Sequence, residues 1–354
     1  MRFFLCLLCT YCLSSCFSQK GPDTNAKRDF SKFPIERKLN EVEILKVDQS
    51  HISYISLYND SILTLVNSSS GSPYHFYPYH LKKGAFLPPQ LEYGRMPDQA
   101  LSFLSYGIEN GYKWVYDINK SKIIFSGFYP AQSTDSLTTV NSKPVPGFYY
   151  SVQLLNDSSL ITSGDYDSPL DYKIAILNLN NSKIERQMIR YSPDTSNPYN
   201  RQRKMAYESF LFLKPSKTKC VLASRYADRI EIVDIDSGKS KVVVGPEGFE
   251  PNMIVMTGGD GKKLSARGPD TRYAFVRGKT TENFIYLLYS GDKDDSKHAF
   301  YGNYIYVYDW NGSPVQRLEL SKPVLDFTIT SDDSLIYTYN PVSKNISSAN
   351  IKTK

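Results

Sequence analysis

The sequence predicts an all-β protein, a six-bladed β-propeller with four-stranded antiparallel blades. Two observations predict it: strands with a period of two, and a turn-then-strand unit that recurs at intervals on the order of 50 residues. The clearest strand covers residues 304–309, where tyrosines alternate with Ile305 and Val307. Asn311-Gly312 follows it and predicts a two-residue type I′ turn, in which both residues have positive φ, before a second strand over 315–320.

The recurring unit begins with a turn of Asn, Asp, Ser or Gly and continues as an apolar strand. Asn156-Asp157 before Leu160 is a clear instance. Such turns lie near residues 59, 109, 156, 217, 281 and 332. A second hairpin follows each turn, so each unit supplies a four-stranded blade. Radial repetition of six blades leaves only short, protected edges.

The two ends of the chain predict how the ring closes. The last unit has three strands, near residues 324–330, 335–339 and 346–351, and is one strand short. Residues 42–47 form one strand too many at the other end. Pairing this N-terminal strand with the last unit would remove two open edges. An unpaired N-terminal strand is the alternative.

Composition supports strands and turns and excludes some function classes. The chain has 28 Tyr, 18 Phe, 20 Gly and 20 Pro, and 41% of its residues are hydrophobic. The net charge of +6 is not concentrated in one run. A nucleic-acid binder would carry a basic stripe, so no nucleic-acid partner is expected.

The first residues predict export and lipidation. Residues 1–15, with Arg2 before an apolar run, have the pattern of a signal peptide. Leu13-Ser14-Ser15-Cys16 matches a bacterial lipobox, so Cys16 is expected to carry acyl chains such as palmitate that hold the protein in a lipid bilayer. The Cys-x-x-Cys spacings here could indicate a metal or redox site, but their apolar flanks favour the signal peptide. We expect a flexible tether over residues 16–37 and the propeller over 38–354.

A basic, tyrosine-rich stretch before the fourth blade is the candidate ligand site. Its residues are Tyr199, Arg201, Arg203, Lys204 and Tyr207, and Arg225, Arg229, Arg267, Arg272 and Arg277 could extend the same positive channel mouth. Guanidinium groups suit carboxylates and phosphates, and tyrosines offer stacking faces. An anionic or sugar-like ligand is one interpretation. Pairing of these arginines with Asp228, Glu231 and Asp270 on the surface is the other.

Other candidate chemistry is sparse. Asp165, Asp167 and Asp171 cluster in one segment and could bind Ca²⁺, although the EF-hand pattern is absent and a solvated loop without a cofactor is the alternative. No nucleophile signature, H-E-x-x-H motif or P-loop occurs. The glycine-rich residues 255–263 predict a flexible loop between blades four and five. Cys220, alone in the body of the chain, is expected in a buried strand.

Three segments carry a family resemblance: the lipobox at Cys16, residues 224–234 and residues 304–315. They resemble the TolB-like six-bladed β-propeller lipoproteins of the Bacteroidetes, over about residues 38–345 of this chain. The resemblance implies the fold and a cell-envelope location, and it carries over no catalytic residue. In such bacteria an acidic run after the lipidated cysteine marks surface export. None follows Cys16, which favours a periplasm-facing anchor.

These observations together predict a membrane-anchored envelope lipoprotein. We expect its propeller to act as a non-enzymatic binding or scaffold module for a protein or glycan partner. The alternative is a metal-dependent propeller hydrolase or lyase, in which carboxylates from several blades converge at the axis.

Overall fold

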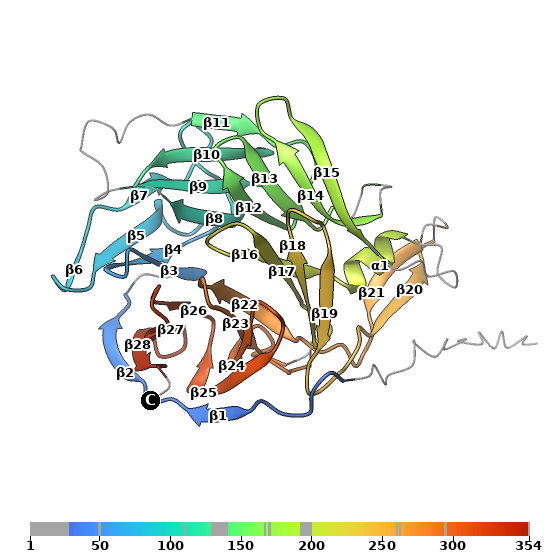
Figure 1. Cartoon of the computed structure of the whole chain (residues 1–354). Coiled ribbons are helices and arrows are strands. Elements are labelled where there is room, and N and C mark those ends of the chain that lie inside the picture. The colour runs from blue at the N-terminus through green and yellow to red at the C-terminus, as the bar shows by residue number, and fades with distance from the viewer. Residues whose placement is uncertain are drawn as a thin grey trace, which may run out of the picture.

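Six antiparallel sheets surround a central axis in the computed structural model (Figure 1). The structure describes residues 28–48, 51–109, 111–128, 141–165, 168, 171–191, 200–259, 261, 263–293 and 296–352. The first strand of every blade is innermost, and these strands lie side by side around the axis. The predicted all-β fold and its six four-stranded blades are therefore confirmed.

Blade one contains β3 (Tyr54–Tyr58), β4 (Ile62–Val66) and β5 (Tyr74–His80), and its fourth strand is divided into β6 (Ala85–Phe86) and β7 (Gln90–Glu92), which both pair with β5. Blade two contains β8 (Phe103–Glu109), β9 (Tyr112–Asp117), β10 (Lys122–Gly127) and β11 (Asn141–Pro144). Blade three contains β12 (Ser151–Asn156), β13 (Ser159–Ser163), β14 (Tyr172–Asn178) and β15 (Lys183–Arg190). Blade four contains β16 (Ser209–Leu213), β17 (Lys219–Ser224), β18 (Arg229–Asp234) and β19 (Ser240–Val244). Blade five contains β22 (Phe275–Thr280), β23 (Phe284–Tyr289), β24 (Gly302–Asp309) and β25 (Pro314–Val324). Blade six contains β26 (Asp326–Ile329), β27 (Leu335–Asn340) and β28 (Asn345–Asn350) from the C-terminal end.

The N-terminal segment completes blade six, as predicted. Strand β2 (Val42–Lys46) pairs antiparallel with β28, and the backbone N–H of Val47 donates to the Lys344 carbonyl at 2.8 Å. The predicted recurring turns all lie between the first and second strands of their blades. Turn chemistry and the spare strand therefore located the blades and the ring closure correctly.

The N-terminal segment also forms a strand that the sequence did not predict. Strand β1 (Ile35–Lys38) pairs in parallel with β25, so blade five gains a fifth strand. Phe33 is buried against Tyr306 and Tyr308. The sequence places residues 28–37 in the predicted flexible tether because polar residues surround them. That prediction is wrong, since the structure shows them packed on blade five. Their aromatic side chains cover the outer part of blade five.

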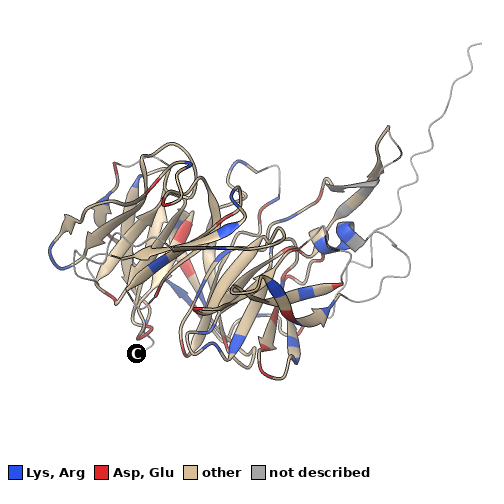
Figure 2. Cartoon of the chain, turned by 90° about the horizontal axis from the view of Figure 1, so that it is seen from above, with Lys and Arg blue, Asp and Glu red and all other residues tan. Residues whose placement is uncertain are grey.

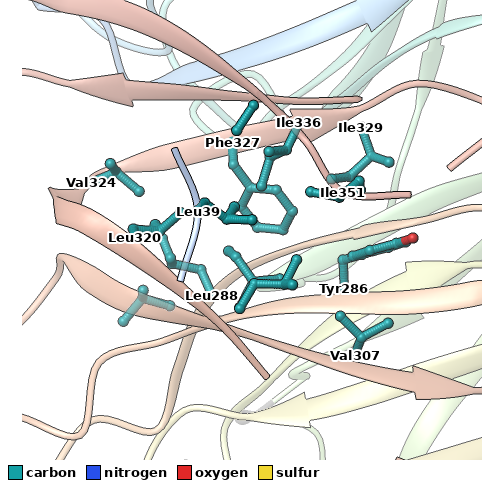
Figure 3. Close-up of a cluster of buried hydrophobic side chains, with 14 of the residues drawn as sticks. Leu39, Tyr286, Leu288, Val307, Leu320, Val324, Phe327, Ile329, Ile336 and Ile351 are labelled. Carbon is teal, nitrogen blue, oxygen red and sulfur yellow. The ribbon is translucent and has the colours of Figure 1, made fainter. Parts of the chain in front are cut away.

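Leu39, between β1 and β2, fills the space between blades five and six. Its side chain lies among Leu320, Phe327 and Ile336 (Figure 3). Glu41 follows and bridges the same two blades, accepting hydrogen bonds from Ser321 and from the Thr338 hydroxyl. One short segment thus joins the last two blades through pairing, packing and hydrogen bonds.

Two local predictions differ from the structure. The Gly312 N–H donates to the Asp309 carbonyl, so Trp310 and Asn311 are the two central residues of the turn. Of Asn311 and Gly312, only Gly312 has a positive φ. The type I′ prediction is therefore wrong. The glycine-rich loop is instead a hairpin of β20 (Met253–Thr257) and β21 (Lys263–Arg267). It forms a separate two-stranded sheet that stands away from the blades (Figure 2).

In the part of the chain that the structure describes, no helix is long and apolar enough to cross a membrane. The short helix α1 (Asn200–Ala206) lies next to β20 and β21 (Figure 1). Cys220 is fully buried in β17, as predicted, and burial raises the pKa of its thiol.

Candidate functional site

The longest connections of blades three to five gather at one end of the ring. In an antiparallel blade the loop between the second and third strands lies at the same end as the connection to the next blade. We call this end the connection face and define it by residues 145–150, 200–208, 224–229, 245–259, 263–274 and 296–301. It carries α1 and the β20–β21 hairpin.

A buried ion pair enclosed by aromatic rings lies at the centre of the connection face. Arg225 Nη1 donates to Glu208 Oε1 at 2.7 Å, and both side chains are mostly buried. The Arg225 guanidinium carbon also lies 5.3–5.9 Å from four ring centroids, those of Phe210, Tyr226, Tyr273 and Phe300. We call these six residues the Arg225 cluster. Burial lowers the pKa of Arg225, but Glu208 more than offsets it, so the pKa is raised overall and the group stays charged.

Further cations border the Arg225 cluster. Arg267, at the end of β21, donates to the Tyr273 hydroxyl at 2.7 Å. Burial raises the pKa of Tyr150, Glu208 adds to that effect, and Arg225, Arg201 and Arg267 oppose it. All three arginines are therefore within electrostatic range of one tyrosine. The predicted residues Arg201 and Arg225 thus lie in the same part of the connection face.

Two other predicted arginines are held by the connection from blade four to blade five. Arg229 lies 3.6 Å from Glu250 and stacks on the Tyr207 ring. Arg272 pairs with Glu247 and lies 4.4 Å from the Phe249 ring centroid. The structure pairs these arginines with carboxylates, as the second interpretation expected, but with different ones. Asp270 pairs with Lys293, and Glu231 pairs with Lys173.

The remaining predicted cations contact the aspartate-rich segment of blade three. Arg203 Nη2 lies 2.6 Å from Asp171 Oδ1. The buried Lys204 ammonium donates to the backbone carbonyls of Asp165 and Ser168 at 3.1 and 2.8 Å. Tyr199 and Asp167, which belong to the same two predictions, lie outside the described residues, as does Cys16. Among the described residues, no group of three or more His, Cys, Asp or Glu side chains is arranged to hold a metal ion.

Asp228 is a buried carboxyl group at the base of the connection face. Its Oδ2 accepts hydrogen bonds from the Glu247 and Gly248 backbone N–H groups at 2.8 and 3.0 Å. Its buried Oδ1 accepts no hydrogen bond from any residue that the structure describes. Burial raises the pKa of Asp228 to about 6, although the two N–H groups oppose the rise. The Asp228 carboxyl group therefore holds the 247–250 segment in place, although burial disfavours its ionised form.

Exposed apolar side chains are the feature of this face that the sequence did not single out. Phe300 is 48% exposed although its ring lies 4.9 Å from that of Tyr273. Phe148, Ile254 and Met256 are also exposed on the same face. Ile254 and Met256 lie on one side of β20, as alternate strand residues must. Only the knowledge that 253–257 is a strand could have shown this from sequence.

The fold and this face define a class: a six-bladed propeller whose loops carry a rigid patch of paired charges and aromatic rings. A family profile described as TolB-like 6-blade propeller-like matches residues 30–332, and the chain belongs to that family. No curated protein matches the chain.

Two solved structures are similar to this chain. A putative exported protein from Bacteroides fragilis superimposes with a TM-score of 0.54 at 12% identity, covering 90% of this chain and 99% of its own. Hydrazine synthase from Kuenenia stuttgartiensis gives a TM-score of 0.47 at 11% identity, covering 88% of this chain and 98% of its own. At these identities the similarity concerns the fold alone.

Proposed function

We propose that this protein is a bacterial envelope lipoprotein, held at a membrane by acyl chains on Cys16 and facing the periplasm. Its propeller is a non-enzymatic binding module that recognises a protein partner through the connection face. The observation that carries the proposal is the Phe300 ring, which is half exposed and yet packs on Arg225 and Tyr273.

A ring in this position suits an anchor for a partner. Phe300 lies 5.4 Å from the Arg225 guanidinium carbon and packs on Tyr273, so little conformational freedom remains to be lost on binding. Aromatic and arginine side chains dominate the energetics of protein interfaces, especially where neighbouring contacts exclude water. The Arg225–Glu208 pair is already formed, so docking would not need to break an internal ion pair.

The surrounding residues favour a protein over a glycan. Ile254 and Met256 present aliphatic and thioether groups on the hairpin beside the cluster. Methionine and aromatic residues are enriched in the buried centre of protein interfaces. A glycan, which offers many hydroxyl groups, would leave these side chains poorly matched. A glycan partner is therefore the alternative outcome of the test.

Side chains at the axis favour a binding module over the metal-dependent hydrolase or lyase. The channel-facing groups include Tyr54, Tyr106, Arg277 and Lys279 beside the carboxyl of Asp326. Metal sites of this kind draw several oxygen ligands from carboxylates and carbonyls. Two cations next to one carboxyl group would repel a divalent ion.

The position of the chain at Arg28 is compatible with a membrane anchor. Asp29 exchanges hydrogen bonds with Val244, so the N-terminal segment meets the ring at the outer strand of blade four. Arg28 is the twelfth residue after Cys16. Even fully extended, the chain between them spans at most about 43 Å, which would keep the propeller close to the membrane surface.

The test is crosslinking of the full chain in native membranes, followed by affinity purification. Wild type is compared with Phe300→Ala, with Cys16→Ala, and with Ile184→Ala as a matched control. Ile184 is 40% exposed on β15, at the opposite end of the ring. One recurrent protein should copurify with wild type and Ile184→Ala and be reduced with the other two.

Binding of that purified protein should then be measured directly. Loss of an interface anchor costs about 2 kcal/mol or more, so Phe300→Ala should weaken the dissociation constant about 30-fold. Equal binding by Phe300→Ala and wild type would contradict the proposed surface. Capture of glycan without any protein would contradict the proposed class of partner.

A further inference from the structure

Two cationic side chains project into the central channel from blade five. Arg277 and Lys279 are alternate residues of β22, so they lie on the same side of this innermost strand, about 6.6 Å apart along it. Lys279 Nζ lies 5.9 Å from the ring centroid of Tyr106 in blade two, and the Arg277 guanidinium carbon lies 4.7 Å from that of Tyr54 in blade one. Neither blade one nor blade two adjoins blade five, so these contacts place both cations near the axis.

The residues around the two cations are not all fully buried. Alternate residues of the innermost strands are partly exposed in several blades, including Tyr54, Tyr106, Gln153 and Phe212. Arg277 and Lys279 themselves are partly exposed. The Tyr54 and Tyr106 rings lie 5.4 Å apart and form an aromatic wall beside the two cations. The two partly exposed cations therefore lie beside aromatic rings from two other blades.

The two cations lack ion-pair partners. Within the part of the chain that the structure describes, no carboxylate lies within 4.0 Å of either, and no hydrogen bond from Lys279 to another residue is formed. Arg277 Nη1 donates to the neighbouring Val276 carbonyl at 2.8 Å, and its buried Nε has no partner among the described residues. Four other arginines of the predicted site differ, because each pairs with a carboxylate: Arg203, Arg225, Arg229 and Arg272. Arg277 and Lys279 retain most of their hydrogen-bonding capacity.

The nearby carboxyl group does not neutralise them. Asp326, the first residue of β26, is fully buried, and its Oδ2 accepts a hydrogen bond from the Ile55 N–H at 2.7 Å. Burial raises the pKa of Asp326, with Lys279 and Arg277 opposing the rise. Burial lowers the pKa of Lys279, Arg277 adds to that effect, and Asp326 opposes it. Arg277 and Lys279 thus lie near the Asp326 carboxyl group, and burial disfavours the ionised form of that group.

We infer that the central channel binds a small anion, whose carboxylate or phosphate group lies between Arg277 and Lys279. A guanidinium fork and a mobile ammonium suit either oxyanion. This site is separate from the connection face and goes beyond the protein partner proposed above. The anion would relieve the repulsion between the two cations, so its binding should stabilise the fold.

The test uses the full-length chain with inorganic phosphate or acetate as probes, at an ionic strength held constant with sodium chloride. Phosphate also stabilises proteins generally by exclusion from their surface, so matched variants are needed. Lys279→Met removes the ammonium and keeps the chain length. Lys38→Met removes the same charge from a residue whose side chain is 68% exposed, outside the channel.

Phosphate should raise the unfolding midpoint of wild type and Lys38→Met by the same amount, and of Lys279→Met by clearly less. Without the probe, Lys279→Met should melt no lower than wild type, because it removes a repulsive charge. Arg277→Lys keeps the charge but loses the fork, so calorimetry should show weaker acetate binding. Equal responses of wild type, Lys279→Met and Arg277→Lys to both probes would overturn the inference.

Discussion

Arg225 and Glu208 form a charge pair that spans two segments of the connection face, one just before blade four and one inside it. The 2.7 Å hydrogen bond joins residue 208, directly after the helical segment, to the loop between β17 and β18. The backbone N–H of Arg225 also donates to the Glu208 carbonyl at 2.8 Å. The pair therefore fixes the loop on which Tyr226 and the Phe300 contact depend.

Removing one partner of this pair should cost more than removing both. Arg225→Met leaves the buried Glu208 carboxylate without its cation and should lower the free energy of unfolding by about 3 kcal/mol. Arg225→Met combined with Glu208→Gln should recover much of that loss. Chemical denaturation of the two single variants and the double variant gives the coupling energy. Strictly additive effects would show that the two side chains do not interact.

Asp228 predicts how stability depends on pH. Its pKa is about 6 in the folded protein, above the ordinary value of 3.8, so the folded state binds the proton more tightly than the unfolded state. Stability from this group is therefore present below about pH 4 and is lost as pH rises through about 6. The full loss is on the order of 3 kcal/mol. In Asp228→Asn the free energy of unfolding should fall less between pH 4 and 7 than in wild type, and an unchanged slope would contradict this account.

Ring closure predicts a sharp contrast between two valines of the N-terminal segment. Val47 is fully buried beside blade six, whereas Val42 is 65% exposed. Val47→Asp would bury an unpaired carboxylate and should lower the free energy of unfolding by about 3 kcal/mol or more. Val42→Asp should change it by less than about 0.5 kcal/mol. Urea denaturation compares the two, and similar values would mean that closure adds little to stability.

The turn after β24 predicts another contrast. Gly312 has φ of +81°, and a Cβ atom there would lie 2.7 Å from Val243 Cγ2. Gly312→Ala should cost about 1–2 kcal/mol from the backbone conformation alone. Asn311→Ala, at an exposed neighbour, should be nearly neutral, and thermal unfolding of the two variants tests the difference. A neutral Gly312→Ala would show that the turn adopts another conformation in solution.

Much of the fold could be predicted because local signals repeat. Short polar residues mark the turn after each innermost strand, as at Asn59-Asp60, where both residues have positive φ. The extra strand predicted at residues 42–47 indicated its own partner, because the last blade lacked one strand. The prediction for residues 28–37 was wrong because Phe30 and Phe33 stand among polar residues, and the surface they cover is formed some 270 residues later by Tyr306 and Tyr308.

The candidate site was harder to predict, because its partners are distant or ambiguous in sequence. Arg272 could pair with several acidic residues, and only the folded connection brings Glu247 to it. Arg277 was grouped with the arginines of the channel mouth, but its place in β22 turns it into the channel instead. The period of a strand predicts which side a residue faces, but it does not show which blades lie opposite.

The central claim is that a protein partner docks on the connection face. The most direct measurement places a photoreactive benzoylphenylalanine at position 300, or at position 184 as control, in the whole chain in intact cells. We predict one discrete crosslinked protein from position 300 and none of that species from position 184. The same adducts from both positions, or no adduct from position 300, would contradict the claim.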